Sequence, residues 1–378
     1  MRSQIYFPIL RAKAGEYSAL AALSEHTKSD VCPVIDLPKA KSSQGFDQLQ
    51  ATVVCALAKT WGTAYPFFFD LSRYDPDDKT IEGVAFMTRL FESSRQLGLK
   101  ATPVVGPVLE RYGANGDYFQ CVAAIIKRDG RGVAIRIPHD DVRDAERLDS
   151  VVNEVERLLA VQDDNCDVIL DFGPLDKFPD SRSKIVGLME DLLQPVVRAF
   201  SDRRFRSTIF CASSIPRALG KLADGEAVRL PNAEFMVWNR LVGSRFGQGV
   251  RFGDYAARYA HQTDKEAKAS PPARINLVTR DSHLLCVGEG SSYRDLANRI
   301  AATPEFADQA GAWGRYAVRD AARGHGGVGN ATDWVARDTH MHLETISVAV
   351  KKRLVEVGEK ISASTGNAYL YDQAELGI

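Results

Sequence analysis

The stretch PFFFDL at residues 66–71 decides the fold, because runs of the same kind recur along the chain. It is short, rich in aromatic residues and apolar up to its aspartate, which is typical of a parallel strand buried on both faces. Six further runs share this character: IYFPIL (5–10), VCPVID (31–36), KATPVV (100–105), GVAIRI (132–137), DVILDF (167–172) and STIFCA (207–212). Their first residues lie 26 to 40 positions apart, so the chain repeats one strand-containing unit seven times.

Segments with helical periodicity separate these runs. They include EYSALAALSEH (16–26), FDQLQATVVCALAKTW (46–61), TIEGVAFMTRLFESSRQLG (80–98) and RLDSVVNEVERLLAVQ (147–162). Strands that alternate with helices indicate βαβ units, a parallel sheet and right-handed crossovers. Seven evenly spaced units predict an α/β fold, a (β/α)8 TIM-barrel-like architecture. The rival is a doubly wound open sheet, whose usual Gly-rich first turn is missing from LRAKAGE (10–16).

The eighth strand of such a barrel has two candidates. We favour GVRFGDY (249–255), and INLVTR (275–280) is the competitor. The segment RINLVTRDSHLLCVGEG (274–290) has the pattern of a hairpin, and SYRDLANRIAATPEF (292–306) that of a helix. The Gly- and His-rich residues 319–344 are loop-like, and ISVAVKKRLVEVGEKI (346–361) predicts a closing helix. We therefore expect one domain over 1–378, with a barrel core at about 1–255 and a C-terminal elaboration over 256–378.

Composition narrows the function classes. The chain has 378 residues, of which 45% are hydrophobic and 26% charged, and its formal net charge is −1. Global charge therefore does not support binding to nucleic acid or to an anionic membrane, although a local basic patch stays open. Six cysteines lie at least 23 residues apart, which excludes zinc-ribbon spacing and a dense disulfide framework. Because the sequence has neither a signal-peptide pattern nor an apolar run of about 18 residues, we expect a cytoplasmic protein.

Polar side chains follow the predicted strands at the end where a parallel barrel has its site. In chain order these residues are Lys13, Asp36, Asp70, Arg136, Asp171, Ser213 with Ser214, and Asp254. Buried charges are costly unless they are paired or bound to metal, so this clustering predicts a polar site. The alternative for each aspartate is structural, because a carboxylate at a strand end also caps the next helix or fixes its loop.

Asp70 and Asp171 are the strongest functional candidates, since each directly ends a strongly apolar strand. Lys13 is a candidate Schiff-base amine or phosphate ligand, or else a counter-ion for Glu16 or Asp36. Arg136 lies between two isoleucines, so we expect it to be buried and paired with Asp171 on the neighbouring strand. That pair would serve either as scaffold or as a substrate clamp.

A metal site is a further hypothesis. Three convergent carboxylates would suit a hard divalent cation such as Mg²⁺. His340 and His342 would face the same side of a strand, but two imidazoles alone are a weak signal, and a hydrogen-bonding latch is the alternative. The glycines of GHGGVGNATDW (324–334) allow a close backbone approach to an anion, without the Lys-Ser/Thr ending of a P-loop. Trp334 would either stack on a base or anchor its loop.

Several motifs resemble those of the Beta protein family, first known from a satellite phage. They are YFPILRAKAGEYSAL (6–20), PVIDLP (33–38), FFFDLS (67–72), RFGDYA (251–256), WGRYA (313–317), GVGNATDW (327–334) and THMHLE (339–344). The resemblance runs from Tyr6 to about Val350 and implies a role in phage–host conflict, as immunity, exclusion or neutralisation of a companion toxin. The resembling pattern includes Lys13, Glu16, Asp70, Asp171, Asp254 and His342. One departure is Asp36, which stands where the pattern has Glu, so its reach is one methylene shorter.

Two functions follow as hypotheses. The first is a phage-defence enzyme, metal-assisted, acting on a phosphorylated or nucleotide-like substrate at the carboxyl rim of the barrel. The second is a binding protein that senses a phage product or partners a toxin or nuclease encoded nearby. For the enzyme we assign catalytic roles to Lys13, Asp70, Arg136, Asp171 and Asp254. We assign binding roles to Asp36, Ser213, Asn330, Trp334 and His342.

Overall fold

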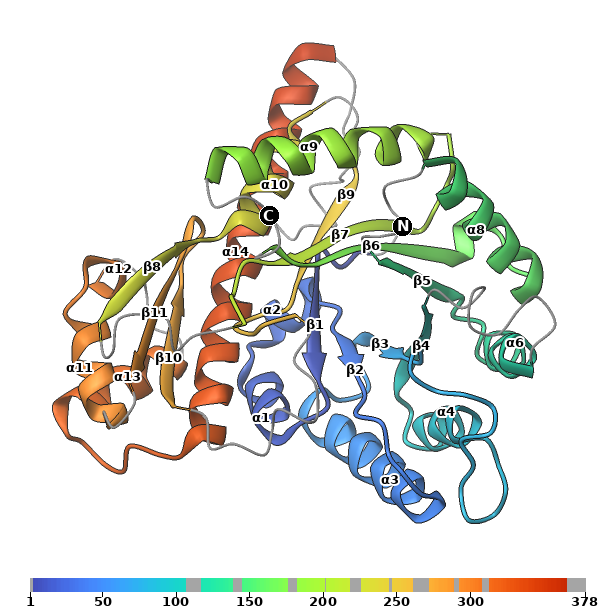
Figure 1. Cartoon of the computed structure of the whole chain (residues 1–378), viewed down its shortest axis with the longest axis horizontal. Coiled ribbons are helices and arrows are strands. Elements are labelled where there is room, and N and C mark those ends of the chain that lie inside the picture. The colour runs from blue at the N-terminus through green and yellow to red at the C-terminus, as the bar shows by residue number, and fades with distance from the viewer. Residues whose placement is uncertain are drawn as a thin grey trace.

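Eight parallel strands close into a barrel in the computed structural model of the chain (Figure 1). The structure describes residues 3–106, 117–138, 145–175, 182–200, 202–217, 226–244, 247–260, 272–288, 292–307 and 313–365. In barrel order the strands are β1 (Tyr6–Arg11), β2 (Val34–Asp36), β3 (Pro66–Asp70), β4 (Lys100–Val105), β5 (Val133–Pro138), β6 (Cys166–Pro174), β7 (Ser207–Ser213) and β9 (Val250–Asp254). The predicted (β/α)8 barrel is therefore confirmed.

Helices surround the barrel, as Figure 1 shows for α3, α4, α6 and α8. Their bounds are α1 (Ala14–Ala22), α2 (Glu25–Asp30), α3 (Ser43–Thr60), α4 (Phe86–Gln96), α6 (Asp117–Asp129), α8 (Ala145–Leu159), α9 (Arg182–Ala199) and α10 (Ala233–Val242), with a 3₁₀ turn at Asp163–Asn165. Each strand thus buries one face against helices and the other inside the barrel, which explains why the strand sequences are apolar throughout.

The alternation of side chains along each strand fixes which residues reach the mouth. Phe68 of β3 and Ile169 of β6 belong to the cluster inside the barrel, whereas Phe69 and Leu170 pack in the outer layer with the helices. Two residues beyond Phe68 and Ile169, at the carboxyl ends of these strands, stand Asp70 and Asp171. Because successive side chains point to opposite faces, both aspartates point into the barrel and towards its mouth.

The eighth strand is β9, as favoured from the sequence. It pairs in parallel with β1 and β7, and Phe252 lies opposite Tyr6 on one side and Phe210 on the other. Gly253 is required at this closure, because a Cβ there would lie 2.8 Å from the Phe7 carbonyl oxygen and 3.3 Å from that of Phe210. The competing segment from Ile275 lies outside the barrel, in a separate antiparallel sheet.

The C-terminal elaboration is a three-stranded sheet with helices (Figure 1). It contains β8 (Ala227–Pro231), β10 (Ala273–Val278), β11 (Ser282–Gly288), α11 (Tyr293–Ala301), α12 (Pro304–Ala307), α13 (Trp313–Arg323) and α14 (Ala331–Thr365). The predicted hairpin is confirmed as β10 and β11, and the predicted helix as α11. Strand β8, which pairs with β11, was not expected from the sequence, and it lies before residue 256, where the elaboration was expected to begin.

The loop expected over residues 319–344 is wrong. Helix α13 continues to Arg323, and α14 begins at Ala331 and continues through the two histidines. The glycine cluster occupies only the turn between these helices. The prediction was wrong because it extended the loop from these glycines into the two flanking helices. Helix α14 contacts α1 of the barrel and β10 of the sheet, and it joins the two parts of the molecule.

The elaboration has a hydrophobic cluster of its own, built around Leu277, Leu284, Ile300 and Val318. The expectation of a single domain over 1–378 stays a prediction, and residues 366–378 lie outside the described residues. Among the helices that the structure describes, none is long and apolar enough to cross a membrane.

Candidate functional site

Arg136 is the centre of a charged cluster inside the barrel mouth. Its Nε and Nη2 donate to Asp171 Oδ2 at 2.9 and 2.6 Å, and its Nη1 donates to Asp70 Oδ2. The predicted pairing of Arg136 with Asp171 is confirmed. A guanidinium held between two carboxylates is fixed in orientation, because its planar fork matches their oxygen geometry.

Tyr255 completes this cluster, which we call the Arg136 cluster (Asp70, Arg136, Asp171 and Tyr255). The Tyr255 hydroxyl donates to Asp171, with oxygen separations of 2.8 and 2.7 Å, and accepts from Arg136 Nη2 at 2.7 Å. Tyr255 was not predicted from the sequence, although it follows Asp254 directly. The available signal was the phase of β9, whose inward positions are Arg251, Gly253 and Tyr255.

Burial makes the Arg136 cluster electrostatically tight. The Asp70 and Asp171 side chains are 2% and 5% exposed, whereas Arg136 is 17% exposed and gives the cluster its contact with the mouth. Burial alone would lower the pKa of the guanidinium, but Tyr255 and the surrounding carboxylates raise it well above its ordinary value. For the Tyr255 phenol, by contrast, burial raises the pKa, so the hydroxyl keeps its proton at neutral pH.

Both aspartates also hold their own loops. Asp70 Oδ1 accepts the Ser72 amide at 2.9 Å, and Asp171 Oδ1 accepts the Gly173 amide at 2.9 Å. Each carboxylate therefore has two roles at once: it fixes its own loop, as expected for a structural carboxylate at a strand end, and it pairs with Arg136. These bonds fix one oxygen of each carboxylate, so the carboxylates are held rigidly towards Arg136.

A second group of charges lies beside the Arg136 cluster, at the ends of β1 and β2. A narrow cleft there, which we call the β1–β3 cleft, is lined by Arg11, Lys13, Asp36, Pro38 and Arg73. Arg73 Nη2 lies 3.5 Å from Asp36 Oδ2. Burial raises the pKa of the Asp36 carboxyl above its ordinary value, while the Arg73 guanidinium opposes this shift. Carboxyls with perturbed pKa values in a cleft are candidates for proton transfer.

Lys13 and the nearby Lys39 have different surroundings. Lys39 Nζ donates to the Arg73 carbonyl at 2.8 Å and pairs with Asp78. Lys13 is the N-cap residue of α1 and makes no side-chain capping bond. The proposed counter-ion role of Lys13 towards Glu16 is not what the structure has, because Glu16 pairs with Arg258 at 3.0 Å.

Asp254 does not line the mouth, and the expectation that it does is wrong. It shares the outward phase of Val250 and Phe252, which pack in the outer layer. Its Oδ1 accepts the Tyr6 hydroxyl at 2.7 Å, and its Oδ2 lies 2.7 Å from His342 Nε2 on α14. The carboxylate therefore ties the barrel wall to the elaboration.

His342 belongs to a buried polar junction behind the barrel wall. Its ring stacks on that of His283 with centroids 5.7 Å apart, and His283 Nε2 lies 3.4 Å from Glu234 Oε1. Glu234 Oε2 in turn accepts the Ser214 amide at 3.0 Å. We call these residues, with Tyr6 and Asp254, the junction network. These residues are buried and connect the two parts of the molecule. Their role resembles the hydrogen-bonding latch that the sequence offered as the alternative for His342.

The remaining predicted binding residues have local structural contacts. Ser213 Oγ donates to the Arg258 carbonyl at 3.0 Å, and Asn330 Oδ1 accepts amides from the first turn of α14. Trp334 is buried, stacks on Tyr293 with centroids 5.2 Å apart and donates to the Val328 carbonyl. Of the two roles considered for Trp334, the structure therefore favours anchoring of its loop over stacking on a base.

The expected histidine pair is not formed. His340 and His342 lie on a helix, where residues two apart point to different sides, and His340 Nε2 lies 3.2 Å from the Ala22 carbonyl. Within the described ranges no group of three or more His, Cys, Asp and Glu side chains is placed to hold a metal ion. At the mouth, the two carboxylates best suited to Mg²⁺ already have Arg136 as their counter-ion.

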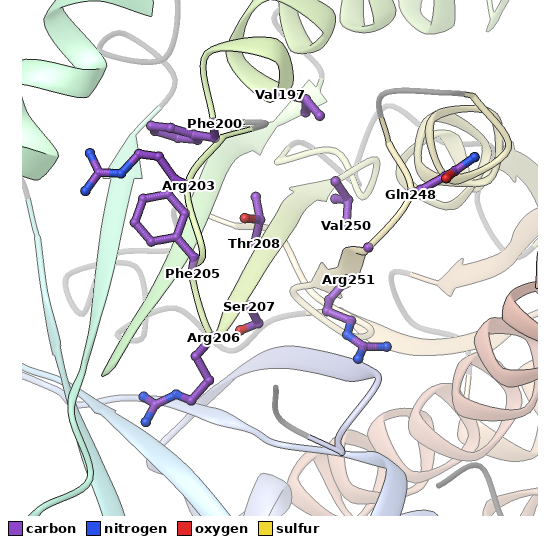
Figure 2. A pocket seen from close by; sticks show the side chains of 11 residues that line it. Val197, Phe200, Arg203, Phe205, Arg206, Ser207, Thr208, Gln248, Val250 and Arg251 are labelled. Atoms are coloured by element: carbon purple, nitrogen blue, oxygen red, sulfur yellow. The ribbon is translucent and has the colours of Figure 1, made fainter. Parts of the chain in front are cut away.

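A cavity of about 160 Å³ opens at the opposite end of the barrel, at the amino ends of β7 and β9. Figure 2 shows that Arg203, Arg206 and Arg251 point in different directions there and do not converge on one position. Arg206 pairs with the buried Asp167, and Arg203 pairs with several acidic side chains. The cavity therefore lacks a convergent set of polar groups, and the mouth is the better candidate site.

Comparisons with known proteins agree with the resemblance seen in the sequence. A family model described as Beta protein matches residues 6–347, which is most of the chain. No curated protein sequence matches this chain.

Several solved barrel structures are weakly similar. Triosephosphate isomerase from Bartonella henselae aligns at 11% identity and a TM-score of 0.33, over 66% of this chain and 90% of that one. Type I 3-dehydroquinate dehydratase from Clostridium difficile aligns at 13% identity and a TM-score of 0.36, over 70% and 89%. Similarities of this size carry no argument about activity.

Proposed function

The chain belongs to the Beta protein family, and on that premise we propose that it is an enzyme acting on a small phosphorylated or nucleotide-like substrate at the barrel mouth. The observation that carries the proposal is the Arg136 cluster. Two buried carboxylates, a guanidinium and a phenol lie at the carboxyl end of a parallel barrel, where barrel enzymes have their sites.

The energetic cost of this arrangement supports a functional role. Taking charges out of water costs several kcal/mol per ion, and well-packed apolar residues of similar volume are often equally stable. The layer of the barrel interior next to this cluster is filled by apolar residues such as Phe68 and Ile169. A cluster of four polar groups at one end of that interior is therefore better explained by chemistry at the mouth than by stability.

The cluster has groups for acid–base chemistry. Asp171 accepts from Tyr255 and from Arg136, so a substrate group that displaces Tyr255 would meet an oriented carboxylate. Tyr255 would then donate its proton or a hydrogen bond to the substrate. The electroneutral chain favours a small molecule over a long polymer. Since Arg136 already pairs with both carboxylates, we assign their orientation to Arg136 rather than to a metal ion.

A second candidate function is recognition of a phage product or of a neighbouring toxin or nuclease. One observation favours it. Trp313 and Tyr316 on α13 are 42% and 51% exposed, and both residue types are enriched where binding energy concentrates at protein interfaces. Trp334, by contrast, is buried and is removed from the surface that such a partner would contact.

Phage plating on cells that carry the native locus tests the enzyme proposal. We expect Asp171→Asn and Tyr255→Phe to abolish protection, because each removes one polar group from the Arg136 cluster with little change of shape. Thermal melts run alongside, since a buried ionic cluster can also fail through stability. Retained protection in both variants would contradict the enzyme, and a wild type without protection would remove the phage-defence context.

A further inference from the structure

Helix α13 presents a row of aromatic and basic side chains to solvent. These residues lie three or four positions apart and so follow one face of the helix: Trp313, Tyr316, Arg319 and Arg323. Trp313 and Tyr316 are 42% and 51% exposed, and Arg323 is also exposed. Arg319 Cζ lies 5.7 Å from the centroid of the Tyr316 ring, so a guanidinium lies over an exposed ring. We call this row, together with Arg294 of α11, the basic face.

The basic face lies in a positively charged part of a nearly neutral chain. Helices α11 and α13 contain five arginines and two aspartates, with no lysine and no glutamate. The whole chain has a formal net charge of −1, so the remaining residues are negative in sum and the global balance conceals this region. The local basic patch that composition left open is therefore present here.

The two aspartates of these helices offset only part of this charge. Asp295 lies near Arg294, but its carboxylate also caps α11, where Oδ2 accepts the amide of the N-cap residue at 3.0 Å. Asp320 is the neighbour of Arg319 in sequence. Among the residues that the structure describes, no carboxylate forms an ion pair with Arg319 or Arg323. The two arginines of the basic face on α13 are therefore available to an anionic partner.

Arg315 adds a further positive charge beneath the basic face. Its side chain is buried, with Nη1 donating to the Phe306 carbonyl at 3.2 Å and the guanidinium over the Phe306 ring. Nη2 makes no hydrogen bond to any described residue. Burial lowers the pKa of this guanidinium to about 10, and repulsion from Arg319 adds to the shift, so Arg315 is charged at neutral pH. An anion bound at the basic face would offset the cost of this buried charge.

The turn after α13 leaves room for a phosphate group beside these arginines. A Cβ at Gly326 or Gly327 would meet nothing within 4 Å, so the backbone there is open to solvent. A Cβ at Gly324 would lie 3.8 Å from Arg294 Cζ, which places a guanidinium of α11 against the same turn. Glycines allow a phosphate to approach the backbone closely. The close approach to an anion predicted from the glycines of residues 324–334 is therefore available at the surface, next to Arg323.

We propose that the basic face binds single-stranded nucleic acid, with its arginines on phosphates and with Trp313 and Tyr316 stacked on bases. Surfaces that bind single strands combine cations along the backbone with exposed rings on which bases stack. Arginine suits both parts, because its guanidinium pairs with phosphate oxygens in bidentate geometry and also stacks on rings. Helices α11 and α13 lie on the side of the elaboration away from the barrel, so this binding is separate from the function proposed for the mouth (Figure 1).

Other partners fit the basic face less well. The apolar side of α13, with Val318 and Ala321, packs in the core of the elaboration and is not free to enter a membrane. Two exposed rings on one helix offer little apolar surface to a protein, since a stable protein interface buries about 800 Å² on each partner. A single strand needs only stacking and phosphate contacts, and the basic face offers both.

Fluorescence anisotropy of labelled oligothymidylate and oligouridylate, titrated with the full chain, tests the proposal. Strands of about 16 nucleotides cover the largest site expected for one small domain. We expect each strand to bind about tenfold more tightly than a duplex of the same length or polyglutamate, because only unpaired bases offer faces for stacking. Three arginines on phosphates predict that log K falls with log salt at a slope of about −2. No binding of either strand, or equal binding of duplex or of polyglutamate, would overturn the proposal.

Substitutions of arginine test the phosphate contacts. We expect Arg323→Gln to weaken binding about fivefold and to reduce the salt slope by about 0.7, because it removes one phosphate contact. Arg128→Gln makes the same change at a 65% exposed arginine on α6, away from the basic face, and should change the affinity less than about twofold. Equal loss in Arg128→Gln would show general electrostatics and overturn the proposal.

Substitutions of Tyr316 test the stacking. We expect Tyr316→Ala to weaken binding about tenfold with an unchanged salt slope, because it removes a ring and no charge. Tyr316→Phe is the matched control, since it keeps the ring and should bind as the wild type does. Thermal melts of both variants establish that they are folded. Equal binding by Tyr316→Ala and the wild type, or equal loss in both variants, would overturn the stacking assignment and the proposal with it.

Discussion

The Arg136 cluster and the junction network are built from the same parts and lie on opposite sides of one barrel wall. Each has a strand-end aspartate that accepts from a tyrosine hydroxyl, Asp171 from Tyr255 and Asp254 from Tyr6. Asp171 shares the inward phase of Ile169, whereas Asp254 shares the outward phase of Phe252. The group that pairs with the aspartate differs accordingly: it is Arg136, which reaches the mouth, for Asp171, and the buried His342 of α14 for Asp254. A position at a strand end therefore does not by itself identify a site residue. The face of the strand to which the side chain points, inside or outside the barrel, does identify it.

The largest expected effect is the loss of the counter-ion in the Arg136 cluster. Arg136→Met leaves two buried carboxylates without compensation, and we expect the free energy of unfolding to fall by about 3–5 kcal/mol. Urea unfolding measures this loss. Arg136→Lys is the matched control, because it keeps the charge and loses the planar fork, so its loss should be smaller. A loss below about 1 kcal/mol for Arg136→Met would mean that water reaches both carboxylates.

The next effect separates stability from function across the wall. Asp254→Asn weakens bonds to Tyr6 and His342, and we expect a loss of about 1–3 kcal/mol in the free energy of unfolding. Phage protection should persist at temperatures where the variant is folded, whereas Asp171→Asn should abolish it. Paired melts and plating assays measure both. Protection lost in folded Asp254→Asn would show that the junction network takes part in function.

A smaller effect concerns the dependence of stability on pH. Burial raises the pKa of Asp338 on α14 to about 7, although Arg274 and other cations nearby oppose the shift. The folded state therefore holds this proton to higher pH than the unfolded state, and the cost of ionisation is absent below the ordinary value of 3.8 and complete above about 7. We expect Asp338→Asn to gain stability relative to wild type as pH rises from 4 to 8. Urea unfolding at several pH values measures this difference, and a constant difference would contradict it.

The smallest effect is expected on the exposed face of α13. Tyr316→Ala should change the free energy of unfolding by no more than about 0.5 kcal/mol, since surface substitutions away from special features rarely do more. Trp313→Ala should cost more, because its indole packs against the buried His340 ring. Protection should be retained if the mouth performs the function. Lost protection with an unchanged melting temperature would favour the binding protein instead.

Much of the barrel could be predicted because its signal is local. Seven apolar runs and the eighth at Val250–Asp254 all form strands where the sequence places them. Strand β8 was missed because it lies half-exposed at the edge of a small sheet and lacks the continuous apolar pattern of the barrel strands. The start of α14 was missed because glycines near Asn330 outweighed the helical periodicity after it.

The candidate site could be predicted in part for a similar reason. Asp70, Arg136 and Asp171 end strands whose phase is evident from the runs before them, and they meet as expected. Around Asp254 the two faces of the strand are harder to distinguish, since Phe252 and Tyr255 are both large and apolar in part. A shift of one residue moves every side chain to the other face, so Asp254 was placed inside and Tyr255 was overlooked.

The bonds that close the molecule have a consequence for the order of folding. Tyr6 meets its partner Asp254 across 248 positions of sequence, and the Ser24 amide lies 3.2 Å from Glu344, 320 positions away. Contacts of such long range form late, because the entropy of closing the intervening loop is lost before they can stabilise anything. On a ribosome, the outer face of the first strand and helix therefore stays uncovered until the last helix has emerged, and exposed apolar surface of this kind is what chaperones bind.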